Sequence, residues 1–395
     1  MPPVPDLSGS FAVLAASGRN RLYAQPVDTI VAWTGADVDE ALTRLDAALT
    51  SGLHAAGCLT FEAGLALEPR LAALARPLPP ESGPLLWFGL FEGFTDLPDD
   101  WTADLAAQAA AGAAEPLIER RAYAAAFAEV QRLIAAGDVY QINLTFPCRV
   151  PVSGDPVALY AALRDHARAP HGGILRTDDR SILSFSPELF FRRDGQAIEC
   201  RPMKGTATRG ASAEKDRLAV AALSDDPKQQ AENLMIVDLL RNDIARICLP
   251  GSVSVPRLFD VETYPTIHQM TSTVTGTLRE GIGAEALLRA LFPCGSITGA
   301  PKIRATEAIL AVEPESRGIY TGSIGWFAPD GSAEFNVAIR TLDWPTGAPF
   351  ARYGIGSGVV ADSSEASEWR ECLAKAEVLT RRQATPKRAQ APRRS

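Results

Sequence analysis

Apolar residues recur at helical spacing in several stretches of the chain. The clearest stretch has apolar side chains at positions i, i+4, i+7 and i+11, namely Tyr123, Phe127, Val130 and Ile134. Gly137 is expected to end this helix, because glycine readily adopts the left-handed conformation found just beyond a helix C-terminus. The same reasoning predicts further helices over residues 37–49, 228–248, 284–292, 301–311 and 363–382.

Between these helices, short runs rich in β-branched and aromatic residues predict strands. The predicted strands cover residues 57–66, 85–91, 139–150, 181–185, 189–193, 197–201, 271–278, 318–327, 334–343 and 351–360. Asp194-Gly195 and Pro329-Asp330-Gly331 are expected to form hairpin turns. Because the strands come in runs rather than in regular alternation with helices, we predict an α+β fold with largely antiparallel sheets.

Residues 102–116 interrupt this pattern. They are rich in alanine and end in Glu115-Pro116, which predicts either a poorly packed helix or a linker. We therefore expect an N-terminal part at residues 1–116, a core at residues 117–382 and a tail at residues 383–395. The tail is basic, contains two prolines and no aromatic residue, and is expected to be disordered.

Composition places the chain among globular proteins of enzyme size, with 395 residues, 46% apolar and 22% charged. The net charge of −8 disfavours nucleic acid as the main partner. We find no signal peptide and no run of about 18 apolar residues, so no membrane span is expected. The six cysteines lack C-x-x-C spacing, which favours reduced, buried thiols and a cytoplasmic location. Four widely spaced histidines disfavour a His-rich metal site.

The first candidate for chemistry is Lys204, which lies between Pro202 and Gly205 in the stretch Arg-Pro-Met-Lys-Gly-Thr. Proline and glycine so close together exclude a helix interior and an ordinary central strand, and predict a turn. A lysine in such a turn can present its amine to a cavity, where loss of water favours the neutral, nucleophilic form. Glu188 follows a Ser-Pro pair sixteen residues upstream. These residues alone favour the simpler interpretation, an ordinary surface lysine in a turn.

Carboxylates on two predicted helices form a second candidate site. Glu368, Glu371 and Lys375 fall at i, i+3 and i+7 and therefore share one helix face. The simplest interpretation is an ion pair between Glu371 and Lys375. The alternative is that Glu232 and Glu371 converge on Mg²⁺, which takes one or two protein carboxylates and keeps positions for an anionic substrate. Spacing leaves both interpretations open.

Two glycine-rich stretches resemble nucleotide-binding motifs only superficially. Residues 295–302 have the wrong glycine spacing for a phosphate loop, and a proline precedes the lysine. What remains is a turn that leads into a helix with Pro301 at its first position, a candidate site for an anion or a carboxylate. Residues 354–358 (Gly-Ile-Gly-Ser-Gly) suggest backbone kept bare for close approach of another group. No nucleotide cofactor is predicted.

Nine segments in a fixed order make residues 121–379 resemble the chorismate-utilising family, which includes anthranilate, aminodeoxychorismate, isochorismate and salicylate synthases. The segments are residues 137–143, 186–188, 202–206, 232–243, 292–302, 317–322, 338–341, 356–362 and 368–375. The resemblance implies large packed antiparallel sheets flanked by helices, with an active site in a cleft. The N-terminal hundred residues are shorter than in many members, so no effector pocket is predicted there.

The resemblance also implies roles for individual residues. Mg²⁺ would be held by Glu232 and Glu371, with Glu368 close by. Arg340 and Tyr320 match residues that bind a substrate carboxylate. The full set of positions matched to substrate binding is Gln141, Ser296, Thr298, Lys302, Tyr320, Arg340, Gly356, Gly358 and Lys375. His268 matches the family's active-site histidine, although a lone histidine is also compatible with a hydrogen-bonded core residue.

Two positions distinguish among the reactions of the family. Gln141 stands where water-using members carry a lysine base, which favours ammonia as the nucleophile. Lys204 matches the lysine of aminodeoxychorismate synthases. The resemblance therefore implies that Lys204 attacks C2 of chorismate, that Glu188 protonates the leaving C4 hydroxyl, and that His268 also serves catalysis.

The product implied is 4-amino-4-deoxychorismate, a precursor of 4-aminobenzoate and folate, with ammonia supplied by a separate glutaminase subunit. One alternative is the activity of anthranilate synthase component I, which would also eliminate pyruvate. An alternative of another class is a non-catalytic binding or regulatory subunit that retains the fold.

Overall fold

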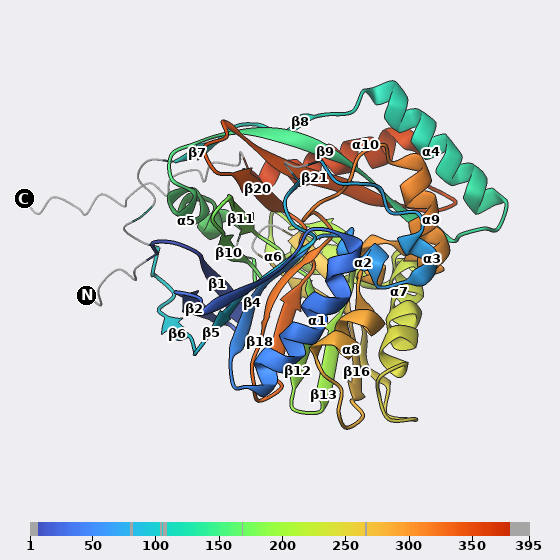
Figure 1. The fold of residues 1–395 in the computed structure, drawn as a ribbon. Helices are drawn as coiled ribbons and strands as arrows, with labels where there is room; N and C mark the ends of the chain where they lie inside the picture. The colour runs from blue at the N-terminus through green and yellow to red at the C-terminus, as the bar shows by residue number, and fades with distance from the viewer. Residues whose placement is uncertain are drawn as a thin grey trace, which may run out of the picture.

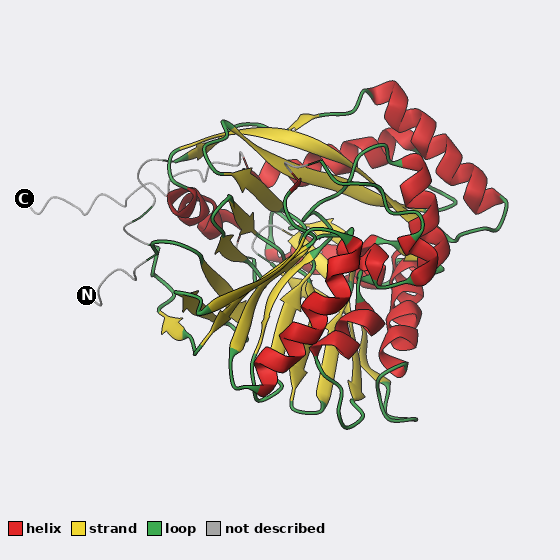
Figure 2. Ribbon diagram, in the orientation of Figure 1, coloured by secondary structure: helices red, strands yellow, loops and turns green. Residues whose placement is uncertain are grey.

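The computed structural model describes residues 7–79, 82–102, 105, 109–167, 169–264 and 267–379. Two large sheets of eleven and ten strands form the centre of the molecule, and the strand pairs of both are antiparallel (Figure 2). Helices α4, α9 and α10 lie beside the first sheet, and α1 and α8 cover the second (Figure 1). The predicted α+β class with large packed antiparallel sheets and flanking helices is therefore confirmed.

Strands from distant parts of the chain build each sheet. The first sheet has the order β17 (Gly299–Ala300), β9 (Gln141–Ser153), β21 (Phe350–Val359), β20 (Thr341–Pro345), β11 (Arg180–Ser184), β10 (Gly173–Arg176), β1 (Phe11–Ala16), β2 (Arg19–Ala24) and β6 (Thr95–Leu97), with β7 (Ala110–Ala111) and β8 (Glu115–Pro116) also on β9. The second has the order β14 (Met203–Thr208), β16 (Ile267–Thr277), β13 (Ala197–Arg201), β12 (Leu189–Asp194), β19 (Ala333–Asn336), β18 (Ser323–Phe327), β4 (His54–Leu59), β5 (Leu86–Phe91) and β3 (Asp28–Ala32), with β15 (Ser254–Thr263) also on β16.

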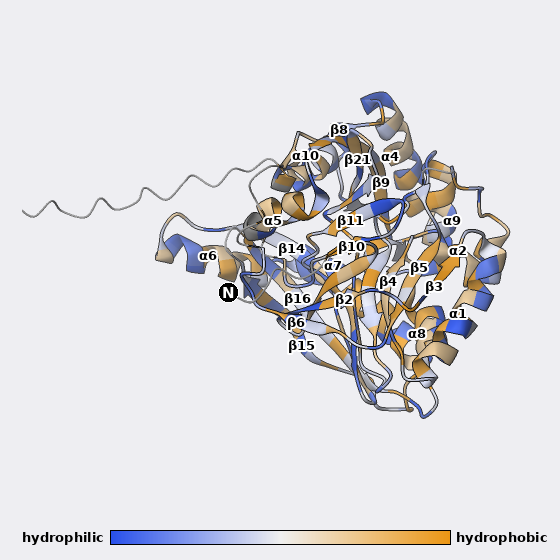
Figure 3. Cartoon of the chain, turned by 60° about the vertical axis from the view of Figure 1, so that its left-hand side comes forward, coloured by the Kyte–Doolittle hydropathy of each residue, from blue (hydrophilic) through white to orange (hydrophobic). Residues whose placement is uncertain are grey.

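The helices surround these sheets. They are α1 (Gly35–Thr50), α2 (Ala63–Ala66), α3 (Pro69–Ala72), α4 (Arg120–Ala135), α5 (Pro156–Ala167), α6 (Ala213–Ser224), α7 (Pro227–Ala245), α8 (Ala284–Leu291), α9 (Lys302–Val312) and α10 (Glu365–Ala376), with the 3₁₀ turns η3 (Gly295–Ile297) and η4 (Glu377–Leu379). The strands are largely hydrophobic, whereas α1 and α4 carry hydrophilic outer faces (Figure 3). In the same view α6 projects from the body of the molecule. The apolar sheet faces therefore form the core, which the amphipathic helices cover.

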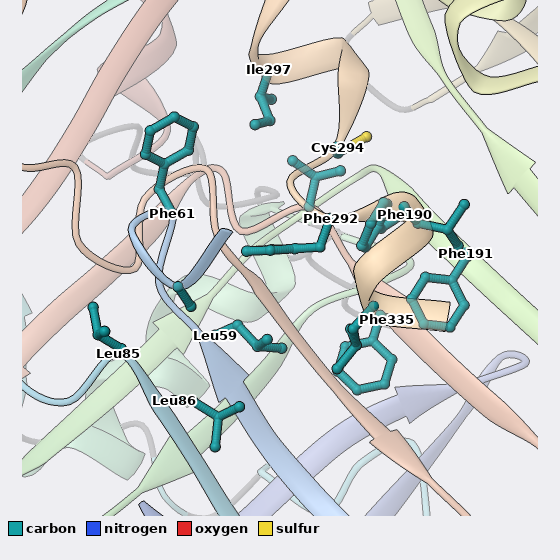
Figure 4. Close-up of a cluster of buried hydrophobic side chains, with 14 of the residues drawn as sticks. Leu59, Phe61, Leu85, Leu86, Phe190, Phe191, Phe292, Cys294, Ile297 and Phe335 are labelled. Atoms are coloured by element: carbon teal, nitrogen blue, oxygen red, sulfur yellow. The ribbon is translucent and has the colours of Figure 1, made fainter. Parts of the chain in front are cut away.

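The core joins the N-terminal part of the chain to the rest. Phe335 of β19 stacks on Phe191 of β12 at 5.1 Å between ring centroids, and Phe327 of β18 lies 4.6 Å from Phe335. Leu59 of β4 belongs to the same buried cluster (Figure 4). The first 116 residues thus supply strands to both sheets, and the division of the chain at residue 116 stays a prediction.

Most predicted helices and strands are found within a few residues of their expected ends. Several predictions were wrong. The strand predicted over 57–66 ends at Leu59, and α2 follows, because the apolar residues after it pack as a helical turn. Within residues 102–116 the described part forms no helix but two short strands on β9.

Another error concerns the strand predicted over 334–343. It is two strands, β19 in the second sheet and β20 in the first, separated by residues 337–340. Arg340, the last residue of this break, has a positive φ of 52°, a conformation that a continuous strand does not accommodate. Likewise, residues 318–322 form a turn before β18 rather than its beginning.

Other expectations concern burial and the chain ends. All six cysteines are free and buried, as predicted. No helix in the described part of the chain is long and apolar enough to cross a membrane. The predicted basic tail, residues 383–395, and the end of the last predicted helix, residues 380–382, lie outside the described residues.

We expect the start of α7 to depend on a side-chain cap. Asp226 Oδ1 accepts the backbone N–H groups of Lys228 and Gln229 at 2.9 and 3.2 Å, and Pro227 occupies the first helical position. Replacement of such a cap by alanine costs about 1 kcal/mol. Asp226→Ala should therefore lower the free energy of unfolding by about 1 kcal/mol in urea titrations. Asp226→Asn should stay close to the wild type, and equal stability of the alanine variant would contradict the assignment.

Candidate active site

Lys204 lies on a strand and not in the turn that the sequence predicted. It belongs to β14, which continues β13 beyond Pro202 and stands at the end of the strand order of the second sheet. The pairing with β16 shifts between Met203 and Thr206, and Gly205 has a positive φ of 83°. This bulge explains how a strand can form beside Pro202 and include Gly205, because proline and glycine are both tolerated at the end of a sheet and at bulges.

The Lys204 amine is poised to lose its proton. The residue is half-buried, and among the described residues its Nζ makes no hydrogen bond or ion pair. Burial lowers the pKa of Lys204, although the negative charges of Glu232 and Glu188 act in the opposite direction. A lysine without a fixed partner and with a lowered pKa can act as a nucleophile.

Glu188 lies where the chain passes from one sheet to the other. It sits between β11 of the first sheet and β12 of the second, and it is 5% exposed. Burial raises the pKa of its carboxyl group to about 7, against the effects of a hydrogen bond with Ser296 and the positive charge of Lys204. Glu188 can therefore hold a proton near neutral pH.

The connection between the two sheets that contains Glu188 is hydrogen-bonded to a second connection, residues 337–340. Ser186 Oγ donates to the Val337 carbonyl at 2.6 Å, and Val337 N–H donates to the Glu188 carbonyl at 3.1 Å. Phe185 N–H donates to the Arg340 carbonyl at 3.0 Å. These bonds hold Glu188 and Arg340 in fixed relation.

The side chains of Gln141 and Lys204 both approach Gly358, a residue of β21 that has no side chain. A Cβ atom on Gly358 would lie 3.0 Å from Gln141 Nε2 and 3.1 Å from Lys204 Nζ. Gln141 is fully buried, yet within the described ranges neither its Oε1 nor its Nε2 has a hydrogen-bond partner. An unpaired buried amide is costly, so this one marks a position where a ligand supplies the missing hydrogen bonds.

The predicted substrate-binding glycines form a stripe on β21. Gly358 pairs with Asn143 of β9 and Gly356 with Thr145, so both lie within the first sheet. Gly354, which the sequence analysis did not assign to the site, extends the stripe, and a Cβ there would come 2.0 Å from the Tyr320 ring. Tyr320 therefore lies directly on β21, as close approach requires.

Arg340 is a cation without an acidic partner in the part of the chain that the structure describes. Burial lowers the pKa of its guanidinium group. The positive φ of this non-glycine residue is a strained conformation, which occurs most often at binding sites. Arg340 thus has its donors available for a carboxylate.

The three candidate metal ligands come from two helices. Burial raises the pKa of Glu232 on α7, and the charges of Glu368 and Glu371 on α10 raise it further. Glu371 Oε1 lies 2.8 Å from Lys375 Nζ, which also donates to the Gly356 carbonyl at 2.8 Å. Partial burial acts to raise the pKa of Glu371, but the ion pair outweighs it and lowers that pKa.

These carboxylates suit a hard cation, although no ready metal cluster exists among the described residues. No three His, Cys, Asp or Glu side chains there gather closely enough to hold an ion. Carboxylates on these two helices, whose negative charges act on one another, still fit the one or two carboxylates that Mg²⁺ takes. The simple Glu371–Lys375 pair is present, and Mg²⁺ remains a prediction.

The side chains of the remaining predicted residues bond to other groups of the same chain. Thr298 Oγ1 donates to the Cys294 and Gly295 carbonyls at 3.2 Å. Lys302 Nζ forms an ion pair with the buried Asp243 and donates to the Leu291 carbonyl at 2.9 Å. Their roles in substrate binding remain predictions, whereas Ser296 reaches the site through its hydrogen bond with Glu188.

His268 is buried and bonded through both ring nitrogens. Nε2 lies 2.9 Å from Asp216 Oδ1 and Nδ1 lies 3.0 Å from Thr263 Oγ1. Asp216 also binds the Arg209 side chain, so the histidine belongs to a network that the sequence analysis missed. Its catalytic role remains a prediction.

Glu188 should make stability depend on pH. Its pKa is raised from 4.5 to about 7, so the folded state holds the proton more tightly than the unfolded state. The stabilisation that this tighter proton binding gives to the folded state is complete below about pH 4.5, and it is lost as pH rises through about 7. Relative to Glu188→Gln, the wild type should lose roughly 3 kcal/mol between these values in urea unfolding. A difference that stays constant or grows with pH would contradict the assignment.

Comparison with known proteins identifies the family. The model of the chorismate binding enzyme family matches residues 10–381. Aminodeoxychorismate synthase component 1 of Klebsiella aerogenes is 43% identical over 258 residues, which cover 65% of this chain and 57% of that protein. The protein of the same name from Bacillus subtilis is 37% identical over 287 residues, covering 73% and 60%. The chain thus spans less than two thirds of the length of these relatives.

Solved structures share the fold at lower identity. Anthranilate synthase component I from Streptococcus pneumoniae TIGR4 has a TM-score of 0.78 and 24% identity, covering 95% of this chain and 93% of that one. The 2,3-dihydroxybenzoate-specific isochorismate synthase from Bacillus anthracis has a TM-score of 0.75 and 22% identity, covering 94% and 95%. Because the family match extends over nearly all of the described residues, the chain belongs to the family of chorismate binding enzymes.

Proposed function

We propose that this chain is component 1 of an aminodeoxychorismate synthase, which aminates chorismate at C4 in a Mg²⁺-dependent reaction. The observation that carries this proposal is the group formed by Glu188, Lys204 and Gln141: a carboxyl group with a pKa of about 7, an amine with a lowered pKa, and an amide without partners. Water-using chemistry would not need a nucleophilic amine. The names of the most similar curated relatives in the comparison agree with the proposal.

In the proposed reaction, the neutral Lys204 amine attacks C2 of chorismate and the ring double bond shifts. The C4 hydroxyl leaves as water after taking a proton from Glu188, which regains one from the alkylated Lys204 nitrogen. Ammonia then adds at C4, the double bond shifts back, and the Lys204 amine leaves C2. In total, chorismate and ammonia give 4-amino-4-deoxychorismate and water.

Substrate orientation would come from the stripe on β21. Arg340 and Tyr320 are suited to bind the enolpyruvyl carboxylate, and the bare backbone at Gly356 and Gly358 would let the substrate approach Lys204. Mg²⁺ held by Glu232 and Glu371, with Glu368 nearby, would supply positive charge for the ring carboxylate. His268 would take part through its network with Asp216.

Gln141 favours ammonia over water as the second nucleophile. A neutral amide cannot deprotonate water, but its Oε1 can accept a hydrogen bond from ammonia and its Nε2 can donate to the substrate. Ammonia already carries the lone pair that water gains only with a base. The relatives are named component 1, and we infer that a glutamine amidotransferase subunit supplies the ammonia, for 4-aminobenzoate and folate synthesis in the cytoplasm.

Two other functions remain to be excluded by experiment. Anthranilate synthase component I activity would release pyruvate. A nucleophilic Lys204 would have no role in that elimination. A non-catalytic binding subunit would have no use for a buried acid beside a lysine with a lowered pKa, because both perturbations cost stability.

Product analysis tests the proposal. Purified protein with chorismate, Mg²⁺ and ammonium in mildly alkaline buffer should form aminodeoxychorismate without pyruvate, as read by liquid chromatography and mass spectrometry. Lys204→Ala should lower the rate by about 10²- to 10⁴-fold, while the control Lys215→Ala, on exposed α6, should keep it. Anthranilate with pyruvate would identify the alternative enzyme. No turnover with a glutaminase subunit added would favour the binding subunit.

The bare position at Gly358 gives an independent test. Gly358→Ala would press a methyl group against Lys204 Nζ and Gln141 Nε2. We expect kcat to fall by roughly 10- to 100-fold with little change in melting temperature, since displacement of reacting groups by about 1 Å has such effects. Gly93→Ala is the matched control, because a Cβ there meets nothing within 4 Å. Unchanged kcat in Gly358→Ala would contradict the placement of the reacting groups.

A further inference from the structure

We propose that Glu62, a carboxylate from the N-terminal part of the chain, is a positioning residue that holds Tyr320 in the substrate site. The consequence for substrate binding rests on the proposed function, whereas the effect on Tyr320 itself does not. Glu62 was not singled out by the sequence, and it is separated from Tyr320 by most of the chain.

The Glu62 carboxylate binds the backbone just before Tyr320. Oε1 accepts the Arg317 N–H at 2.7 Å and Oε2 accepts the Gly318 N–H at 3.0 Å. The neighbouring Phe61 N–H donates to the Gly318 carbonyl at 2.8 Å. Glu62 is only 9% exposed, so both of its oxygens are committed to this turn.

The turn needs such support because Thr321 is strained. Thr321 has a φ of 62°, whereas the φ of 63° at Gly318 is a conformation that glycine adopts without steric cost. A β-branched residue at positive φ is a marked outlier, and surrounding contacts must maintain it. Tyr320 lies between these two positions, so its ring direction depends directly on the turn conformation.

The side chain of Arg317 fastens the same turn from the other side. It pairs with Glu313 at 2.7 and 2.8 Å and donates to the Asn143 carbonyl at 2.7 Å. Its guanidinium lies 4.5 Å from the centroid of the ring of Phe61, the residue next to Glu62. Arg317 thus fixes the turn to β9, while Glu62 fixes it to the N-terminal part.

Tyr320 borders a small groove. The groove has a volume of about 40 Å³ and is also lined by Thr145, Arg317, Gly354 and Arg352. The ring now rests on Gly354, beside the stripe that would receive the substrate. A ring that tipped into the groove would withdraw the Tyr320 hydroxyl from the proposed carboxylate.

Asp46 offers a matched control for Glu62. It is also a carboxylate of the N-terminal part, and its oxygens accept the backbone N–H groups of Ala284 and Glu285 at 2.6 and 3.4 Å. These N–H groups lie at the start of α8 and not in the 317–321 turn. Asp46→Asn should therefore lower stability without changing the position of Tyr320.

The direct test labels Tyr320 with 3-fluorotyrosine and records its ¹⁹F NMR signal in the full-length protein. Wild type and Asp46→Asn should give the same narrow signal. Glu62→Gln should shift or split it, because the amide offers a donor to one of the two N–H groups. Glu62→Asp, which shortens the side chain, should do the same and serves if the glutamine variant folds poorly. An unchanged signal in a folded Glu62 variant would overturn the proposal.

Kinetics test the consequence. Glu62→Gln should raise KM for chorismate about tenfold and change kcat by less than about twofold, since it acts on binding through Tyr320. In a Tyr320→Phe background the same change should raise KM by less than about twofold. If Glu62→Gln raises KM by the same factor in the Tyr320→Phe background as in the wild type, then Glu62 does not act through Tyr320. A wild type that does not turn over chorismate would instead contradict the proposed function, and the ¹⁹F result would stand.

Discussion

The buried guanidinium of Arg317 joins the segments from which the candidate site is built. It donates to the Glu313 carboxylate, to the Asn143 and Ile297 carbonyls, and to the Thr321 hydroxyl. A charge this deeply buried is tolerated only when it is paired and its donors are satisfied. Asn143 lies on β9 and Ile297 in η3, while Glu313 and Thr321 flank Arg317 in the connection between α9 and β18, so the requirement to satisfy one cation ties these three segments together.

The site follows from this arrangement and from the way the chain passes between the sheets. Glu188 and Arg340 occupy two neighbouring passages, where neither residue belongs to a regular strand. β21 supplies a bare surface next to Tyr320 and Gln141, and β14 brings Lys204 to Gly358 on this surface. Groups with opposite preferences for the proton are thereby held close together, in surroundings that remove water from both.

The sequence predicted the regular elements well because their signals are local. Helical spacing at Tyr123 and Phe127 located α4, and the hairpin at Asp194-Gly195 was recognised from turn chemistry. The errors fall where tertiary contacts override local preference. Arg340 was expected within a strand, yet it lies in the break between β19 and β20 with a positive φ. Lys204 was expected in a turn, but pairing with β16 draws it into a strand with a bulge.

Site residues were predicted by chemistry and family resemblance, but their neighbours were not. Nothing in the spacing of Gln141, Lys204 and Gly358 indicates that they meet, because strand pairing and a bulge create that contact. Glu62 and Arg317 are 255 positions apart, and only the folded chain reveals their bond. Lys302 was matched to substrate binding, and its ion pair with the buried Asp243 could not be predicted from the sequence.

The central claim is that a substrate lies on the bare stripe of β21 between Arg340 and Lys204. A crystal structure of the Lys204→Ala variant with chorismate and Mg²⁺ tests it most directly. The account predicts the enolpyruvyl carboxylate on Arg340 and Tyr320, the C4 hydroxyl toward Glu188, and C2 facing the space left by the lysine. Chorismate bound elsewhere, or bound here with C2 turned away from residue 204, would contradict it.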